Sequence, residues 1–383
     1  EMVIRDWSSD VCSSDLIKKG DSKIGLVADN DDIYQGVCKG DLLIHGMDTW
    51  HGAIAISNFD GMCTPVVHVC DSKQNKTYIA LYLQFMAISK VFKLISNGVR
   101  QNTSDFRSWD KVGAIPIMVP PLHEQQAIVD YLKDKTLKIE QYVSARERER
   151  ELLDSLKQSE IANVVTRGLN PNVKMKDSGI PWIGEIPEHW EVKRWGNAFK
   201  ENKDINSNLE NTTAFQFNYG SLVRKKREYK EEEDAETYAK YTILKPKDIV
   251  INGLNLNYDF VSQRVAISDD NGIITSAYIS MHPRDNVEAQ YFCYLFKTMD
   301  AMKLFHGMGT GIRLTLSFAE LKKQYIPIPP LSEQQAIVAY IDEKLQKIDK
   351  YMCDLQREID YLKEFKQRLI SDAVTGQLCI TKQ

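Results

Sequence analysis

The sequence has few cysteines, and none of them stands in a pattern that marks a metal site. Its seven cysteines among 383 residues are odd in number, scattered along the chain and free of any C-x-x-C pair. Unpaired thiols in a reducing compartment are therefore favoured over a disulfide framework or a zinc site. The chain also lacks a run of about 18 apolar residues and a charged-then-apolar leader. We accordingly expect no membrane contact and a cytoplasmic location.

The sequence has no excess of one charge sign and none of the common nucleotide or metal motifs. There are 49 lysines and arginines against 53 aspartates and glutamates, which gives a net charge of −4. A nucleic-acid contact would therefore depend on local patches. No G-x-x-x-x-G-K-[ST] phosphate loop and no H-E-x-x-H pair occurs, and the glycines of 307–311 lack the preceding strand of a dinucleotide site. We expect no catalytic centre, cofactor or metal on this chain.

What the sequence does contain is a long internal repeat. The 46-residue block 121–166 reappears 209 positions later as 330–375, without a gap and with 21 identical pairs. Average residue usage would give roughly one identity in 15. The segments in front of the two blocks are longer and much less alike. This repeat predicts a duplicated molecule with two similar helices and two divergent heads.

The order of apolar runs and turns divides the chain into two mixed α/β heads, each followed by one long helix. Both heads show short apolar strand patterns ahead of a helical stretch, near 78–95 in the first and near 289–305 in the second. The fold class is therefore α+β with a pseudo-two-fold internal repeat. The expected divisions are a first head at 17–118, a first helix at 119–166, a linker at 167–177, a second head at 178–326, and a second helix with its tail at 327–383.

The first sixteen residues look foreign to this plan. Ser-Ser-Asp occurs twice among them, and they show no apolar period. The segment resembles translated sequencing-adapter read-through, so we expect 1–16 to be non-native. Residues 39–46 align with 246–253 at an offset of 207. Because the second head begins near 178, that offset places the start of an intact first head ahead of residue 1, and we expect the first head to be truncated.

The two long helices carry complementary apolar seams. The second helix has eight apolar residues spaced by four and three, or by seven at the last step: Ile341, Leu345, Ile348, Met352, Leu355, Ile359, Leu362 and Leu369. Such a seam needs a helical partner along its whole length. The first helix offers Leu132, Ile139, Val143 and Leu153 at matching places, and its seam is interrupted at Thr136, Arg146 and Arg150. Those polar residues either fix the register or face water. We expect antiparallel packing, with Leu132 near Leu362.

Both helices open on a proline corner followed by Glu-Gln-Gln. Ser332 with Gln335 forms a capping-box pattern after two prolines, so this signature first indicates a helix start. Contact with a partner subunit would explain why both copies keep it. The residues concerned are Glu124, Gln125, Gln126, Glu333, Gln334 and Gln335.

Several stretches together resemble the specificity subunits of type I restriction-modification systems. They are PPLHEQQAIVDYL with PPLSEQQAIVAYI, the stretch KQSEIANVVTRGLNPNVKMKDSGIPWIGEIPEHWEVKR at 157–194, and the closing KQRLISDAVTGQL. The resemblance covers essentially all of 17–383. The SGIPWIG motif at 178–184 stands before the second head only, so the first head departs from the pattern.

The resemblance implies two target-recognition domains, each reading one half of a bipartite DNA sequence, separated by two helices that form an antiparallel coiled coil. It implies a non-catalytic chain that holds no cofactor. The implied partners are double-stranded DNA, two methyltransferase subunits that supply S-adenosylmethionine, and two restriction subunits that supply ATP- and magnesium-dependent translocation and cleavage. A coiled-coil structural adaptor that binds no DNA is the alternative.

With DNA as the expected ligand, cations would contact phosphates and polar side chains would contact base edges. The candidate phosphate contacts in the second head are Arg224, Lys225, Lys226 and Arg227. A solvated charged turn is the alternative for this basic run. The candidate base contacts are Asn255, Asn257 and Tyr258, in a loop after an apolar strand. Asparagine suits bidentate pairing with adenine, and turn-forming asparagine is the alternative.

The aligned loop of the first head offers different side chains at matching places. Its candidates are His45, Trp50 and His51. Different side chains on matched loops predict two different half-sites. Arg100 with Gln101 in the first head, and Arg313 in the second, follow matched glycines and are further candidates for DNA contact.

Overall fold

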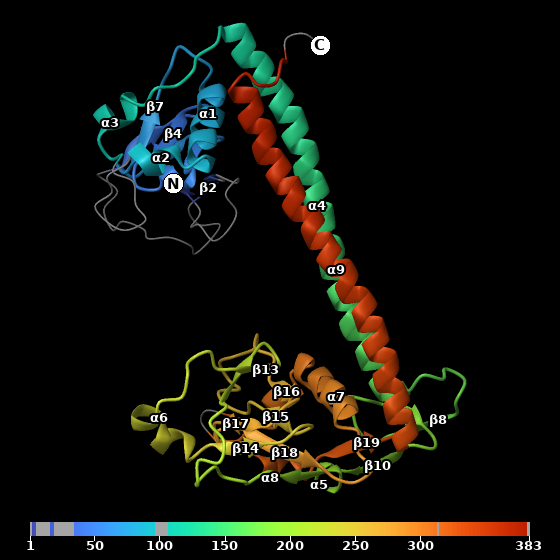
Figure 1. Ribbon diagram of the computed structural model, residues 1–383. Helices are drawn as coiled ribbons and strands as arrows, with labels where there is room; N and C mark the ends of the chain where they lie inside the picture. The colour runs from blue at the N-terminus through green and yellow to red at the C-terminus, as the bar shows by residue number, and fades with distance from the viewer. Residues whose placement is uncertain (1, 5–15, 19–33, 96–105, 312–313, 381–383) are drawn as a thin grey trace. The chain divides into compact units, whose positions relative to one another are not determined.

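The chain forms two compact units, each built from one head and parts of two long helices. Figure 1 shows the computed structural model, which describes residues 2–4, 16–18, 34–95, 106–311 and 314–380. The first unit is Glu1–Glu149 with Asp354–Gln383, and the second is Arg150–Cys353. The long helices α4 (Leu122–Arg167) and α9 (Leu331–Val374) run through both units. None of the described helices is long and apolar enough to cross a membrane.

The head of the first unit is built on short strands. Its strands are β1 (Met2–Ile4), β2 (Leu16–Lys18), β3 (Gln35–Val37), β4 (Leu42–His45), β5 (Ile54–Ile56), β6 (Gly61–Cys63) and β7 (Val67–Cys70). Its helices are a 3-10 turn (Thr49–His51), α1 (Lys76–Ile88), α2 (Val91–Ile95) and α3 (Trp109–Gly113). The strands form a three-stranded sheet of order β5-β4-β7 and the pairs β3-β6 and β1-β2.

The head of the second unit is larger and follows the same plan. Its strands are β8 (Met175–Asp177), β9 (Glu185–Pro187), β10 (Glu191–Arg194), β11 (Phe199–Glu201), β12 (Phe215–Asn218), β13 (Ser221–Arg224), β14 (Thr242–Leu244), β15 (Ile249–Ile251), β16 (Val265–Ile267), β17 (Gly272–Ile274), β18 (Ile279–Pro283) and β19 (Tyr325–Ile328). Its helices are α5 (Trp195–Ala198), α6 (Glu231–Tyr238), α7 (Ala289–Ala301), a 3-10 turn (Leu304–Gly307) and α8 (Phe318–Leu321). The main sheet has the order β11-β18-β15-β16.

The central strands of the two heads are arranged alike. In the first head β4 lies between β5 and β7, and in the second β15 lies between β16 and β18, all antiparallel. Leu42 pairs with Ile56 in one sheet, and Ile249 pairs with Ile267 in the other. The expected mixed α/β heads are therefore confirmed. The helical stretches expected near 78–95 and 289–305 are α1 with α2 and α7 with its 3-10 turn.

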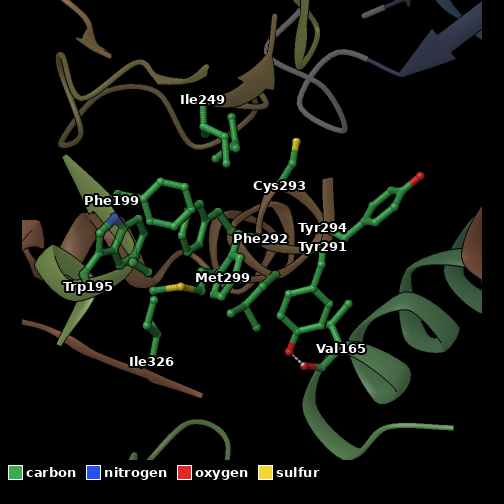
Figure 2. Packing of buried hydrophobic residues seen from close by; sticks show 14 of the residues in the cluster. Val165, Trp195, Phe199, Ile249, Tyr291, Phe292, Cys293, Tyr294, Met299 and Ile326 are labelled. Carbon is green, nitrogen blue, oxygen red and sulfur yellow. Dashed lines mark hydrogen bonds between the residues drawn. The ribbon is translucent and has the colours of Figure 1, made fainter. Parts of the chain in front are cut away.

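Helix α7 supplies much of the core of the second head, and Figure 2 shows its packing. Phe292, Leu295, Phe296 and Met299 follow the i, i+3, i+4, i+7 period of a buried helix face, and all four are at most 1% exposed. The ring of Trp195 stacks on Phe296 with 3.8 Å between centroids. This packing holds α7 against the main sheet, from whose strands the loops of the second head leave.

The long helices pack antiparallel within each unit. In the first unit, ion pairs join Lys366 to Glu140 at 2.6 Å and Lys363 to Glu147 at 3.1 Å. In the second unit, Lys157 contacts Asp349 at 2.6 Å, and the Tyr340 hydroxyl donates to Glu160 at 2.6 Å. In both sets the residue number rises on α4 as it falls on α9. The expected antiparallel coiled coil is confirmed.

The apolar seam is confirmed, but its register differs from the expected one. All eight predicted α9 seam residues and the four on α4 are buried or half-buried. Leu132 belongs to a cluster with Ile370, Ala373 and Val374 rather than with Leu362. The prediction that paired Leu132 with Leu362 is therefore wrong in register, because it counted the spacing without knowing where the helices start to overlap.

One of the polar interruptions bridges the two helices. The guanidinium of Arg146 lies 3.2 Å from Glu358 of α9 and 2.7 Å from Glu149 of its own helix. This geometry agrees with a role in register. Thr136 is half-buried, whereas Arg150 is exposed. Both long helices end at a glycine, Gly168 or Gly376, each with φ of +74°, a conformation that glycine adopts without strain.

Candidate nucleic-acid interface

The predicted base-reading residues lie on two loops that leave equivalent strands. In the first head, the eight residues 46–53 connect β4 to β5. In the second head, the thirteen residues 252–264 connect β15 to β16. The two loops therefore start from the same place in the repeated sheet, but they differ in length as well as in side chains.

Each loop begins at a glycine against which another backbone segment packs. A Cβ on Gly253 would lie 2.6 Å from the carbonyl oxygen of Leu316, and one on Gly46 would lie 2.9 Å from that of Phe106. The glycine carbonyl oxygens accept hydrogen bonds from the amides of the same two residues, at 2.9 Å and 3.0 Å. Only glycine permits this approach, which anchors the base of both loops.

The loop of the second head is held from within by a buried arginine. Arg264 is 1% exposed, and its guanidinium donates to the carbonyl oxygens of Asn252 at 3.1 Å, Leu254 at 2.8 Å and Asp259 at 2.7 Å. Its backbone amide donates to the carboxylate of Asp300 at 2.7 Å. A charged group is buried only when it is paired and hydrogen-bonded. Here its partners are the carbonyls of the loop, so Arg264 shapes the loop directly.

A histidine supports the same loop from the other side. The ring of His306 stacks on Phe260 at 4.6 Å between centroids, and its Nε2 lies 3.1 Å from the carbonyl oxygen of Asp259. The Asp259 carboxylate accepts from the amides of Ser262 at 2.9 Å and Val261 at 3.2 Å. These hydrogen bonds, that of Ser262 first, hold the pKa of Asp259 below its usual value. The loop is therefore a fixed element.

Two of the three predicted residues on this loop are exposed to solvent, and the third is half-buried. Asn255 is exposed with φ of +52°, and Tyr258 is 78% exposed. The side-chain oxygen of Asn257 is buried and the residue as a whole is half-buried, so contact of Asn257 with bases stays a prediction. The sequence could not separate these asparagines, because which one turns inward depends on the path of the loop around Arg264. Phe260 and Val261, which the sequence did not single out, are 55% and 90% exposed.

A hairpin lies beside this loop. Strands β12 and β13 are joined by Tyr219 and Gly220, and β13 lies against β16. A Cβ on Gly220 would lie 2.5 Å from the side-chain oxygen of Gln263, which shows that the turn touches the end of the loop. Tyr219 is 84% exposed. The turn that contacts the end of the loop therefore also carries an exposed aromatic side chain.

The loop of the first head is held by shorter-range contacts. His45 Nδ1 lies 3.0 Å from the carboxylate of Asp48, and their hydrogen bond holds the pKa of Asp48 below its usual value. Trp50 is half-buried against the core of the unit, with the Lys93 ammonium 5.3 Å from its ring centroid. His51 is exposed. Of the three predicted contacts, His51 is the most accessible, while Trp50 also serves the core.

The basic run of the second head is largely engaged within the chain. Arg224 pairs with Asp270 at 2.8 Å, and Arg227 pairs with Glu233 and Asp234 of α6. Lys225 lies over the rings of Tyr238 and Tyr241, at 5.7 Å and 5.4 Å. Lys226 is exposed. Exposed ion pairs contribute only about 0–1 kcal/mol, so phosphates can compete for these arginines. Contact of the run with phosphate remains a prediction.

Three further candidates cannot be placed. Arg100, Gln101 and Arg313 lie outside the described residues. In the part of the chain that the structure describes, no group of three or more His, Cys, Asp or Glu side chains is arranged to hold a metal ion.

Two of the glutamines assigned to subunit contact are buried inside their own units. Gln334 accepts from the amide of Glu288 at 2.7 Å and donates to the carbonyl oxygen of Pro329 at 2.8 Å. Gln125 accepts from the amide of Asn75 at 2.9 Å and donates to the carbonyl oxygen of Pro120 at 2.7 Å. Both side chains are 0% exposed. The prediction of a subunit contact is wrong for these two, because each glutamine ties the start of a long helix to the start of α1 or α7.

The other members of the signature are placed differently. The Glu333 carboxylate accepts from Trp190 Nε1 at 3.0 Å and contacts His189 Nε2 at 2.7 Å. Glu124 is half-buried, and Gln126 and Gln335 are exposed. A subunit contact through these three residues stays a prediction. The expected capping box is wrong, because α9 already begins at Leu331 and Ser332 lies inside its first turn.

Comparison with known proteins identifies the architecture. The family model of the type I restriction modification DNA specificity domain matches residues 38–145 and 187–359. This chain belongs to that family. A Methanocaldococcus jannaschii protein described as a type I restriction enzyme MjaX specificity subunit is 23% identical over 371 residues, which cover 93% of this chain and 75% of that protein. The EcoBI specificity subunit of Escherichia coli is 36% identical over 63 residues, which cover 16% of this chain and 13% of that subunit.

Solved structures show the same fold. One comes from work on the complex assembly and conformational transition of the type I R-M system, with a TM-score of 0.69, 16% identity, and coverage of 91% of this chain and 85% of that one. The HsdS subunit of Thermoanaerobacter tengcongensis gives a TM-score of 0.51 at 18% identity, covering 91% of this chain and 84% of that one. This chain therefore shares its fold with these two solved proteins.

Sequence reasoning missed the residue that organises the loop of the second head. Arg264 stands directly before the VAIS strand, where the aligned position of the first head holds Ala53. An arginine beside an apolar strand reads as a surface charge. The one available signal was the unequal spacing between matched strands, which shows that the second loop has extra residues that need an internal support.

Proposed function

We propose that this specificity subunit binds double-stranded DNA and that each unit contacts one half of a bipartite site. The observation that carries the proposal is the pair of matched loops. They leave equivalent strands of a repeated sheet, yet one is short and carries a histidine while the other is long and carries asparagine and tyrosine. A duplicated scaffold with unlike loops is the arrangement needed to read two unlike half-sites.

The proposal leaves the chemistry to partner subunits. Two methyltransferase subunits would hold S-adenosylmethionine, and two restriction subunits would hold ATP and magnesium. The specificity subunit itself orients the DNA and transfers no methyl group. Its role is therefore carried by rigid loops and by docking surfaces.

The long helices carry exposed apolar side chains suited to docking. In the first unit these are Leu137, Tyr142, Tyr361 and Phe365, which are 52–69% exposed. In the second unit they are Leu152, Leu156 and Tyr351, which are 44–63% exposed. Exposed large apolar groups beyond the intramolecular seam favour a protein partner. We assign these faces to the methyltransferase subunits.

The test uses matched variants in the two loops. The chain is expressed with its cognate methyltransferase subunits, and methylome sequencing of the host gives the bipartite motif. Gel shifts then compare duplexes in which either half-site is scrambled. Asn255→Ala should remove discrimination at one half, and His51→Ala at the other. Loss of discrimination at the same half by both variants, or at neither, would contradict the proposal.

A further inference from the structure

Among the described residues of the second head, the tip of the loop 252–264 gathers the most exposed apolar side chains. Val261 is 90% exposed, Tyr258 78% and Phe260 55%. Tyr219 of the neighbouring hairpin turn is 84% exposed. Single exposed apolar residues are ordinary, but several at one place mark a contact surface.

This tip cannot fold inward, because the loop beneath it is fixed. The Arg264 guanidinium is bonded to the carbonyls of Asn252, Leu254 and Asp259, and His306 stacks on Phe260. The loop is therefore preorganised, and binding a partner through it costs little ordering entropy.

The tip has the chemistry of a base-edge reader and not that of a phosphate clamp. Asp259 is the one acidic or basic residue in 253–263, and its carboxylate lies 3.5 Å from Arg264 and accepts from two loop amides. What remains at the surface is an amide, a phenol, a hydroxyl and apolar groups. Base edges in the major groove offer hydrogen-bonding atoms and the thymine methyl group. Lysine and arginine, the side chains that neutralise phosphates, are absent from 253–263.

We propose that Val261, with Tyr258 beside it, contacts thymine methyl groups in the major groove of the half-site read by the second unit, and that Arg264 is the positioning residue for this contact. The inference rests on the proposed DNA-binding function and names the chemical group that one loop reads. The loop of the first head is shorter, and its Trp50 is half-buried. We therefore expect thymine methyl groups to affect binding through this loop only in the half-site that the second unit reads.

The experiment replaces thymine by deoxyuracil, which removes the methyl and keeps the pairing edge. The assembled complex with its methyltransferase subunits is titrated with duplexes carrying one such replacement at a time. Loss of a buried methyl should lower affinity about fourfold at one or two positions of one half-site. Val261→Ala should abolish that difference and leave any deoxyuracil effect in the other half-site unchanged. Ile205→Ala, which removes a 45% exposed apolar side chain elsewhere in the same unit, should retain it.

The positioning role has its own readout. Arg264→Lys keeps the charge but replaces two separated guanidinium nitrogens, which reach the three carbonyls, by a single nitrogen that cannot reproduce this geometry. We expect it to lower the ratio of specific to non-specific affinity and the thymine-to-deoxyuracil ratio, while the salt dependence of non-specific binding stays the same. If Arg264→Lys fails to fold, Asp259→Asn takes its place. This variant weakens the hydrogen bonds that the Asp259 carboxylate accepts from two loop amides, and it should reduce the thymine-to-deoxyuracil ratio.

Three results would overturn the inference. Equal affinity for thymine and deoxyuracil at every position, or a second half-site without an A·T pair, removes the methyl contact while the DNA-binding function stands. Equal methyl discrimination by wild type and Val261→Ala removes the residue from the contact. Weaker assembly of Val261→Ala with the methyltransferase subunits, at unchanged DNA affinity, assigns the tip to a protein partner. Absence of any sequence-specific binding would instead defeat the proposed function itself.

Discussion

The hydroxyl of Tyr291 donates a hydrogen bond of 2.7 Å to the backbone carbonyl oxygen of Val165 (Figure 2). Tyr291 lies in α7 of the second head, whereas Val165 lies in the last turn of α4, the helix that follows the first head in sequence. The first unit contains the reverse contact: the Tyr78 hydroxyl of α1 lies 3.3 Å from the carbonyl oxygen of Val374 of α9 and 3.0 Å from that of Met118, and it can donate to either. Each head thus holds the end of the long helix that belongs to the other repeat.

Removal of the Tyr291 hydroxyl should destabilise the second unit. Val165 is 0% exposed, and a buried carbonyl oxygen that loses its partner costs about 1–3 kcal/mol. We expect Tyr291→Phe to lower the free energy of unfolding by that amount, measured by guanidinium titration with tryptophan fluorescence. Tyr361→Phe, at a 69% exposed tyrosine, serves as the control and should change it by no more than about 0.5 kcal/mol.

Alkaline pH should act on the first unit through Tyr78. Burial raises the pKa of Tyr78 from 10.0 to about 12, so the unfolded chain loses this proton before the folded chain does. The stabilisation of the folded unit by the buried, protonated Tyr78 hydroxyl is fully present below pH 10 and is lost as pH rises toward about 12. In unfolding titrations across this range, the stability difference between wild type and Tyr78→Phe should shrink as pH rises. A constant difference would count against the burial of this hydroxyl.

The helix register can be checked by crosslinking. The Glu140 carboxylate lies 2.6 Å from the Lys366 ammonium, so Glu140→Cys with Lys366→Cys should join within one chain through a short reagent with two thiol-reactive groups. The exposed Cys38, Cys353 and Cys379 are first replaced by serine. Glu140→Cys with Leu345→Cys serves as the parallel-pairing control and should give no intramolecular product. Preferential reaction of the control would contradict the antiparallel register.

The basic run should contribute affinity without sequence preference. Replacement of Arg224, Lys225, Lys226 and Arg227 by alanine should weaken binding of the assembled complex to every duplex alike. The slope of log affinity against log salt should fall by roughly 0.9 for each phosphate that the variant no longer neutralises. Unchanged affinity and slope would assign the run to a solvated turn.

Removal of the acidic neighbours of this basic run should have the opposite effect on DNA affinity. Arg227 is held by Glu233 and Asp234, and these carboxylates compete with phosphate for it. Glu233→Gln with Asp234→Asn should release the arginine and raise affinity for non-specific DNA at low salt. Glu236→Gln on the same helix, whose carboxylate pairs with Lys240, is the matched control and should have a smaller effect. Because the double variant removes two carboxylates and the control removes one, half the effect in the control would mean that only the net charge matters.

Local sequence determined the long helices and the repeat. The proline corners mark the starts of both helices, which begin at Leu122 and Leu331, and the seam marks α9 as one long helix, because a 3.6-residue period over many turns is a strong local signal. The apolar runs that form β4, β5, β15 and β16 were predictable in the same way, because a short apolar run bounded by turns indicates a strand without information from distant residues.

Tertiary structure decided the roles of individual polar residues. Gln125 and Gln334 stand at helix starts that look exposed in the sequence, yet both are buried, Gln125 against the start of α1 and Gln334 against the start of α7. Asn255 and Asn257 look alike in sequence, but the first is exposed and the second is half-buried with its side-chain oxygen covered, because the loop wraps around Arg264. The offset of Leu132 from Leu362 was likewise set by where the ends of the helices pack. Local pattern fixes what a segment becomes, whereas contacts between distant segments, which depend on the three-dimensional path of the chain, decide which of its polar groups remain available for function.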